Sequence, residues 1–229
     1  MEVGAGLGSL TVALADLGAD VVAIELDAAL VPALDETVGG RDNVRILVAD
    51  ALRLDWGEVL QGGPWTMASN LPYNVAVPVV TELLARAPQV ERLVVMVQRE
   101  VGERLAARAG DDAYGAVSVR VAYHAEARVL RRVPPSVFWP EPLVESVVIE
   151  LVRRAEPPVS TPRDLLFRVV EEGFGQRRKT MANALVRLGL PREDALELLR
   201  SSGIDGRARA ESLSLEQFAR LADGVPWSG

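Results

Sequence analysis

Two hydrophobic patterns alternate along the first 100 residues. Short runs of valine, isoleucine and leucine are separated by longer segments in which apolar positions recur every three or four residues. Runs of the first kind are typical of strands buried on both faces of a parallel sheet, and segments of the second kind are typical of helices that cover such a sheet. The alternation therefore predicts a doubly wound α/β domain.

The predicted elements follow one another with short connections. Strands are expected at residues 20–26, 43–50, 65–70 and 92–98, and helices at residues 10–18, 30–38 and 75–87. Two later apolar runs, at residues 126–133 and 145–154, add strands that we expect to pair antiparallel at an edge of the sheet.

The pattern changes after the last of these strands. Residues 153–162 are rich in proline and small polar residues, which is typical of a linker. Beyond it, four segments have helical spacing with glycine or proline between them: 162–174, 177–188, 191–203 and 214–224. We therefore predict an α/β domain over residues 1–155 and a small all-helical domain over residues 160–229.

Composition excludes several kinds of chemistry. The chain contains no cysteine and a single histidine, which argues against disulfides, thiolate nucleophiles and Cys/His zinc sites, so we expect no metal. Its apolar runs are far shorter than the roughly 20 residues that cross a bilayer, and no signal-peptide pattern follows Met1. We expect a cytoplasmic protein with no membrane partner. Any chemistry that it performs must use carboxylates, amides, backbone groups, aromatic rings or a cofactor.

Charge is distributed unevenly along the chain. The net charge is −7, yet residues 160–229 hold 11 basic against 10 acidic side chains. Between Arg92 and Arg132 there are eight arginines and five acidic residues. The net negative charge argues against a uniformly basic nucleic-acid binder. A nucleic acid would therefore have to bind to local patches of basic residues.

A glycine-rich turn and three acidic residues follow the first predicted strands. Glycines at every second position between a strand and a helix let the backbone approach a ligand at the helix N-terminus, although dinucleotide-binding domains favour G-x-G-x-x-G. Acidic residues lie at the carboxyl ends of three strands, where open α/β sheets bind ligands. The residues concerned are Gly4, Gly6 and Gly8 in the turn and Glu2, Glu25 and Asp50 at the strand ends.

These acidic residues resemble the S-adenosylmethionine site of class I methyltransferases. Glu25 is placed to accept the ribose hydroxyls of a nucleoside, and Asp50 is placed to accept an exocyclic amine. Carboxylates suit a cofactor that carries a sulfonium and an ammonium but no phosphate. The predicted site also includes Leu26, Ala51 and Asn70, and the alternative is that the acidic residues only cap the following helices.

The segment SNLPY at residues 69–73 follows the fourth predicted strand on the same edge. An adenine amino group is a poor nucleophile because its lone pair is conjugated with the ring. The Asn70 side-chain oxygen and the carbonyl of Leu71 or Pro72 can each accept one N–H, which favours a pyramidal nitrogen. Pro72 fixes its own φ, and Tyr73 offers a face for a flipped-out base; the alternative is a Pro-Tyr turn that packs over the sheet.

With these motifs the chain resembles the small-subunit ribosomal RNA adenine N6,N6-dimethyltransferases over almost its whole length. Three further segments separate it from the erythromycin-resistance methyltransferases, which share the cofactor turn: DAYGAVSV, VPPSVFWPEPLVESVVIEL and FGQRRKTMANAL. The resemblance implies a Rossmann-like class I domain and transfer of two methyl groups from S-adenosylmethionine to each of two adjacent adenines. Those adenines would lie in a hairpin loop near the 3′ end of 16S rRNA, within a 30S subunit late in assembly, and we expect a monomer.

The resemblance also assigns further residues. Phe138 would lie on the other side of the target base from Tyr73. RNA phosphates would contact arginines of the locally basic segment and three basic residues that open a helix of the second domain. These residues are Arg99, Arg104, Arg131, Arg177, Arg178 and Lys179, and a solvated or structural role is the alternative for each of them.

Members of that family begin with several dozen residues before the glycine turn, which this sequence lacks. The first strand is therefore expected to have about three residues, where parallel strands usually have five or six. Two other functions remain open: a non-catalytic RNA-binding assembly factor that retains the fold, and an adenine-N6 methyltransferase for another nucleic acid. Intact Asn70, Pro72 and Tyr73 argue against the first of these, whereas the missing N-terminal segment argues for it.

Overall fold

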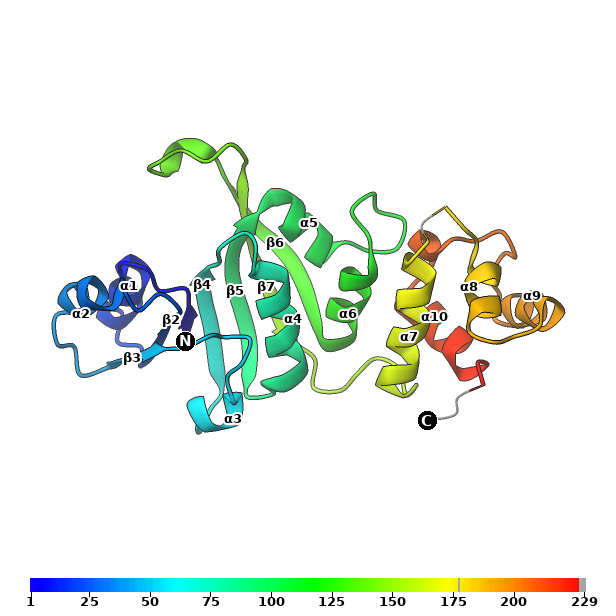
Figure 1. Cartoon of the computed structure of the whole chain (residues 1–229), viewed down its shortest axis with the longest axis horizontal. Helices are drawn as coiled ribbons and strands as arrows, with labels where there is room; N and C mark the ends of the chain where they lie inside the picture. Colours follow the sequence, from blue (N-terminus) through cyan, green and yellow to red (C-terminus); the bar gives the residue numbers. More distant parts are fainter. Residues whose placement is uncertain (177, 227–229) are drawn as a thin grey trace. The chain divides into compact units, whose positions relative to one another are not determined.

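The computed structural model describes residues 1–176 and 178–226, which fold into two compact units. Unit 1 comprises Met1–Glu103 and Ala125–Arg153, and unit 2 comprises Arg104–His124 and the chain from Arg154 onward (Figure 1). A single division near residues 155–160 therefore does not describe the chain. Residues 104–124 belong to unit 2 because their apolar side chains, such as Val119, share a core with the C-terminal helices.

Unit 1 is built on β-strands that pair mostly in parallel. The strands are β1 (Glu2–Val3), β2 (Val21–Glu25), β3 (Val44–Val48), β4 (Trp65–Asn70), β5 (Val90–Gln98), β6 (Ala125–Val133) and β7 (Ser146–Arg153). Strands β1, β2 and β3 are parallel in that order, and β4 and β5 are also parallel. Strand β7 lies antiparallel between β5 and β6, so the predicted antiparallel pair at a sheet edge is confirmed.

The two-residue strand β1 connects the two sets of strands. The backbone nitrogen of Met1 donates to the Thr66 carbonyl at 2.9 Å, and the Ala68 N–H donates to the Met1 carbonyl at 3.0 Å. Such alternating bonds are the pattern of a parallel ladder. The strand order across unit 1 is therefore β3-β2-β1-β4-β5-β7-β6, which puts the carboxyl ends of β1, β2, β3 and β4 at one edge.

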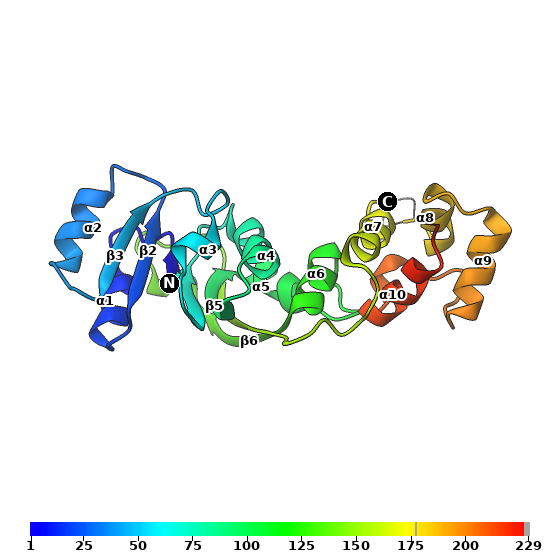
Figure 2. The same cartoon turned by 90° about the horizontal axis from the view of Figure 1, so that it is seen from below.

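Helices cover this sheet. They are α1 (Ser9–Asp16), α2 (Val31–Val38), α3 (Trp56–Val59), α4 (Ala76–Arg86) and α5 (Arg99–Ala106). Helices α1 and α2 lie beside β2 and β3 (Figures 1 and 2), where Leu34 and Val38 share a core with Val21 and Ala23. Helix α3 is a single turn and α5 combines few apolar residues with many charges, and neither was predicted.

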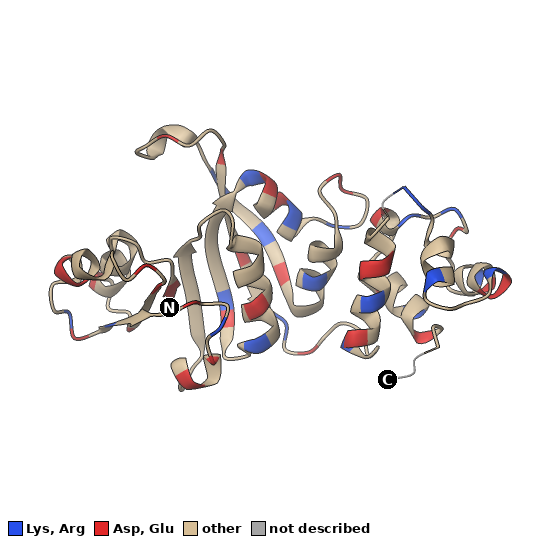
Figure 3. Ribbon diagram, viewed as in Figure 1, with Lys and Arg blue, Asp and Glu red and all other residues tan. Residues whose placement is uncertain are grey.

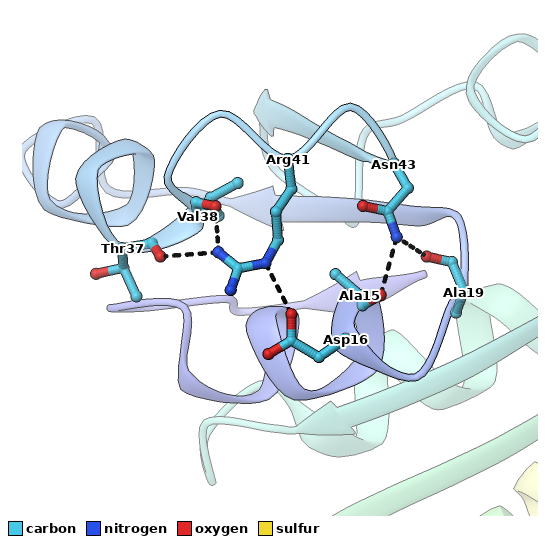
Figure 4. Close-up of polar contacts among 7 residues, drawn as sticks. All are labelled: Ala15, Asp16, Ala19, Thr37, Val38, Arg41 and Asn43. Carbon is cyan, nitrogen blue, oxygen red and sulfur yellow. Dashed lines mark hydrogen bonds and ion pairs between the residues drawn. The ribbon is translucent and has the colours of Figure 1, made fainter.

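The loop between α2 and β3 fastens both helices to the sheet (Figure 4). The Arg41 guanidinium forms an ion pair with Asp16 at 2.9 Å and donates to the Val38 carbonyl at the end of α2. The Asn43 amide donates to the Ala15 carbonyl in the last turn of α1 at 3.0 Å. Carbonyls at helix C-termini lack intrahelical partners, so Arg41 satisfies a carbonyl of α2 that would otherwise need water. Asn43 adds a second donor to the Ala15 carbonyl, which also accepts the Gly18 N–H at 2.9 Å.

Arg153, the last residue of β7, contacts the carbonyls at the end of α4. Its partly buried guanidinium donates to four carbonyls, at 2.8 to 3.0 Å. The acceptors are Leu83, Leu84, Ala87 and Val90. One side chain thus joins the end of α4, the start of β5 and the end of β7.

Unit 2 is helical, as predicted for the C-terminal part of the chain. Its helices are α6 (Ala116–His124), α7 (Arg163–Phe174), α8 (Met181–Arg187), α9 (Arg192–Ser201) and α10 (Leu215–Asp223). They enclose a core that includes the fully buried side chains of Leu166, Leu185, Leu199 and Phe218. Within the described residues, no helix has the length and apolar character to cross a bilayer.

The predicted helix over residues 177–188 begins later than expected. Thr180 has an extended backbone, with φ −76° and ψ 159°, and α8 starts at Met181. The prediction that Arg178 and Lys179 open this helix is therefore wrong. A threonine that caps a helix takes non-helical dihedral angles, so the basic residues before it lie in a turn.

Candidate active site

The glycine turn adopts a backbone that other residues avoid. The φ angles of Gly4, Gly6 and Gly8 are 74°, 56° and 88°, in the left-handed region that favours glycine. A Cβ atom on Gly8 would lie 2.8 Å from a Leu34 methyl carbon. The turn is therefore held close to α2, and the backbone of its middle residues faces the carboxyl edge of the sheet.

The turn also touches the SNLPY segment. A Cβ atom on Gly4 would lie 3.2 Å from Pro72 Cδ and 4.0 Å from the Asn70 carbonyl oxygen. Glycine at this position is what allows Pro72 to pack against the turn. The two segments that sequence analysis assigned to the cofactor and to the reacting amine are thus brought together at one edge of the sheet.

Glu25 ends β2 and is fastened by backbone N–H groups. Its Oε1 accepts hydrogen bonds from Leu26 and Asp27, both at 2.9 Å, and its Oε2 accepts one from Gly6 at 2.7 Å. A carboxylate offers about four lone-pair sites. These three bonds orient the carboxylate at the end of β2, and its acceptance of both ribose hydroxyls stays a prediction.

Asp50 follows β3 and is half-buried. Its Oδ1 accepts from the Leu52 N–H at 2.9 Å, and its Oδ2 lies 3.4 Å from Arg53 Nε. The first contact closes a local turn and does not cap a helix, because α3 begins at Trp56 with Asp55 as its N-cap, and the second is an exposed ion pair of small energetic value. Ala51 is buried, and Oδ2 keeps acceptor capacity toward solvent.

Exposed apolar side chains line the same edge. Leu26, directly after Glu25, is 68% exposed, and Leu7 in the glycine turn and Val48 at the end of β3 are exposed as well. Small-molecule sites are lined mostly by apolar groups with a few polar ones among them. Leu7 and Val48 were not singled out from the sequence, because the apolar pattern does not show which strand-end residues stay uncovered.

Glu2 is a buried carboxyl on β1. Its Oε2 accepts the Thr11 hydroxyl of α1 at 2.6 Å. Burial raises the pKa of Glu2 to about 7, while the Thr11 hydrogen bond acts in the opposite direction. A cation bound nearby would favour the ionised form, so this carboxyl and the glycine turn fit a ligand that carries positive charge and approaches the backbone closely.

The acceptors for an amine lie at the end of β4. Asn70 is exposed, whereas Leu71 is buried and its N–H donates to the Met96 carbonyl at 3.1 Å. The carbonyl of Pro72 accepts the Val75 N–H at 3.1 Å within the turn that leads into α4. The carbonyls of Leu71 and Pro72 were both predicted as the second acceptor for the target amine. Because the Pro72 carbonyl is engaged within the turn, the Leu71 carbonyl is the better candidate.

Tyr73 is held by its hydroxyl. That hydroxyl lies 3.2 Å from the Ser146 Oγ, and 36% of the residue remains exposed. Ser146 begins β7, directly after the loop of residues 134–145 that carries the half-buried Phe138. The hydrogen bond ties the turn to the base of that loop, and the position of Phe138 across a base from Tyr73 stays a prediction.

Comparison with known protein families decides the class. The family model described as ribosomal RNA adenine dimethylase matches residues 1–225. The chain belongs to this family. It is an S-adenosylmethionine-dependent ribosomal RNA adenine dimethyltransferase with a Rossmann-like fold, as the motifs predicted.

Individual relatives agree with this dimethylase assignment. The ribosomal RNA small subunit methyltransferase A of Moorella thermoacetica is 43% identical over 97% of this chain and 81% of its own length. That of Thermobifida fusca is 45% identical over 99% of this chain and 80% of its own length.

Two solved structures resemble the fold. A dimethyladenosine transferase from Plasmodium falciparum has a TM-score of 0.77 at 23% identity and covers 96% of this chain and 86% of its own. The 23S rRNA methyltransferase ErmE has a TM-score of 0.72 at 26% identity and covers 98% of this chain and 89% of its own.

The basic residues predicted to bind RNA differ in their surroundings. Arg99 forms ion pairs with Glu145 at 2.9 Å and Glu103 at 3.8 Å, and Arg104 is only partly exposed. Arg131 is exposed on β6. Arg178 and Lys179 are exposed in the turn before α8, and Arg177 lies outside the described residues.

Two further arginines of the dimethylase lie beside the turn that carries Arg178 and Lys179. The Met181 N–H donates to the Ala208 carbonyl at 2.8 Å, so the segment around Ala208 lies beside the start of α8. This segment carries the exposed residues Arg207 and Arg209. Basic segments gather on these loops of unit 2 (Figure 3). Their proximity could not be predicted from a local pattern, because the two segments are far apart along the chain.

Proposed function

We propose that the protein dimethylates the N6 amino groups of two adjacent adenines in a hairpin loop near the 3′ end of 16S rRNA. The substrate would be a small ribosomal subunit late in assembly in the cytoplasm, and the enzyme would act as a monomer without a metal. The contact between Gly4 and Pro72 carries the proposal, because it joins the cofactor turn to the amine acceptors. The names of relatives at 43% and 45% identity support the small subunit as the substrate.

The glycine turn and three carboxylates would hold the cofactor. S-adenosylmethionine supplies, when bound, a methyl group on a positively charged sulfur. Glu2 favours positive charge in the site, and Glu25 accepts a ribose hydroxyl while its other lone pairs hold the turn in shape. Asp50 accepts the adenine amine of the cofactor, and Leu26 and Ala51 border the ring.

The SNLPY segment would hold the target amine. The Asn70 Oδ1 and the Leu71 carbonyl each accept one N–H, which directs the nitrogen lone pair away from the plane of the base. Catalysis then rests on positioning, and no strong base is required because the alkylated amine loses its proton readily. Pro72 keeps the turn rigid, and Tyr73 stacks on the flipped base opposite Phe138.

Basic residues of both units would bind RNA phosphates. In unit 2 these are Arg178, Lys179, Arg207 and Arg209, with Arg177 as an expected further contact. In unit 1, Arg131 is exposed, whereas Arg99 already pairs with Glu145, so we expect a weaker contribution from Arg99 and Arg104.

The test is methyl transfer from labelled S-adenosylmethionine to small subunits that lack the modification, followed by digestion of the RNA. N6,N6-dimethyladenosine at adjacent positions is the expected product. Asn70→Ala should reduce transfer by at least about 100-fold, since one oriented acceptor is lost. Asn74→Ala is the matched control, because Asn74 is an exposed asparagine of the same turn with no assigned role.

Three outcomes would contradict the proposal. Transfer to large-subunit RNA, and not to small subunits, would assign the substrate named for ErmE instead. Tight binding of small subunits without transfer would favour a non-catalytic assembly factor. Normal turnover by Asn70→Ala would exclude the role given to this side chain.

A further inference from the structure

The loop of residues 134–145, between β6 and β7, exposes large apolar side chains. Trp139 is 98% exposed, Leu143 is fully exposed, and Val137 and Val144 are also exposed. The loop projects from the end of β6 and β7 in Figure 1. A cluster of uncovered apolar side chains on one loop is uncommon in a soluble domain and marks a surface that meets a partner.

The loop is restrained although its side chains are uncovered. It contains four prolines, each with a fixed φ, and a short 3-10 helix at Pro135–Val137. The Phe138 N–H donates to the Pro135 carbonyl at 3.0 Å, and the Arg99 N–H donates to the Glu145 carbonyl at 2.9 Å at the end of the loop. A partner would therefore meet a preordered surface, which lowers the entropic cost of binding.

Trp139 follows Phe138 directly in the chain. The backbone of Phe138 is extended, with φ −107° and ψ 151°. Successive side chains of an extended segment point to opposite sides. The half-buried side chain of Phe138 and the exposed indole of Trp139 therefore point to different sides of the loop.

The charges around the loop favour a nucleic acid as the partner. Arg131 and Arg132 on β6 lead into the loop, are exposed, and form no ion pair with a described residue. Of the two acidic residues in the loop, Glu145 is paired with Arg99. Exposed aromatic rings flanked by arginines are the combination with which proteins hold single-stranded nucleic acids.

We propose that Trp139, supported by Leu143, is a stacking platform for an unpaired nucleotide next to the target adenine. The inference rests on the proposed function, because it requires RNA as the substrate. The inference adds Trp139 as a residue that positions the RNA. Stacking on Trp139 would hold the strand beside the base that reacts, which gives a reason why two neighbouring adenines can be presented one after the other.

The experiment compares Trp139→Ala, Trp139→Phe and Leu143→Ala with the wild type. Binding to unmodified small subunits is measured by co-sedimentation, and methyl transfer is measured at varied subunit concentration. We expect Trp139→Ala to raise both the Kd and the KM about tenfold with kcat unchanged, Leu143→Ala to have a smaller effect, and Trp139→Phe to retain most of the affinity. Leu17→Ala is the matched control, because Leu17 is 86% exposed and directly follows α1, away from the loop of residues 134–145 in the sequence.

Each other outcome has one meaning. If the wild type methylates small subunits and Trp139→Ala has the same KM, the inference is wrong and the proposed function stands. If the wild type transfers nothing yet binds subunits, and Trp139→Ala weakens that binding, the proposed function fails, and the contact of Trp139 with RNA stands without its link to a target adenine. If Trp139→Ala only converts a dimer to a monomer, with RNA affinity unchanged, the loop is an interface between copies and the inference is wrong.

Discussion

Replacing Glu2 by glutamine tests the electrostatics of the site. In the folded protein the pKa of Glu2 is raised from its ordinary value of 4.5 to about 7, chiefly by burial. Between these values the folded state binds more protons than the unfolded state, so this group makes stability fall as pH rises. The loss begins near pH 4.5 and is complete above pH 7, where it amounts to about 3 kcal/mol as an upper limit.

Glu2→Gln removes the titration but keeps an acceptor for the Thr11 hydroxyl. The stability difference between variant and wild type should therefore grow in favour of the variant from pH 5 to pH 8, by about 2 to 3 kcal/mol. Urea unfolding at the two pH values measures it. Glu36→Gln, on the exposed surface of α2, controls for the loss of one carboxylate.

The same substitution should weaken cofactor binding. The ionised carboxylate attracts a cation, so the affinity for S-adenosylmethionine should rise with pH through about pH 7 in the wild type and stay flat in Glu2→Gln. Isothermal titration calorimetry at several pH values measures this. A stability difference that does not change with pH would refute the reasoning, and so would equal pH profiles for cofactor binding.

Two further predictions concern arginines. Arg153→Met should destabilise the protein by about 3 kcal/mol, because carbonyls at the end of α4 lose a partly buried charged donor. Urea unfolding measures this, with Arg132→Met on the exposed face of β6 as the control, and equal stability of Arg153→Met and the wild type would contradict it. The double variant Arg207→Ala with Arg209→Ala should bind small subunits more weakly, and its binding constant should depend less on salt concentration. Arg163→Ala, at another exposed arginine of unit 2, is the control and should change neither quantity. An unchanged salt dependence in the double variant would place both arginines outside the interface.

Much of the fold could be predicted because hydrophobic period is a local property. The β-branched runs predicted the strands, and the antiparallel pair β6 and β7 followed from two adjacent runs without a helix between them. The meeting of Gly4 with Pro72 also followed, since parallel strands share an edge for their carboxyl ends.

What could not be predicted depends on contacts between distant segments. Nothing local to residues 104–124 shows that their apolar side chains pack with the C-terminal helices, or that Arg207 lies beside the turn before α8. The Glu25 carboxylate accepts three backbone N–H groups, one of them from Gly6. This arrangement depends on the three-dimensional path of the glycine turn, which the spacing of glycines in the sequence does not specify. The start of α8 was misplaced because a run of basic residues continued the helical spacing past its threonine cap.

The position of β1 has a mechanical consequence. Strands β2 and β3, which lead to Glu25 and Asp50, lie on one side of β1, and β4 with Asn70 lies on the other. The cofactor residues and the amine acceptors are therefore held in register through β1. A ligand that contacts both the glycine turn and Asn70 binds segments on both sides of β1. Binding would therefore stabilise the arrangement of strands that aligns the methyl donor with the acceptor amine.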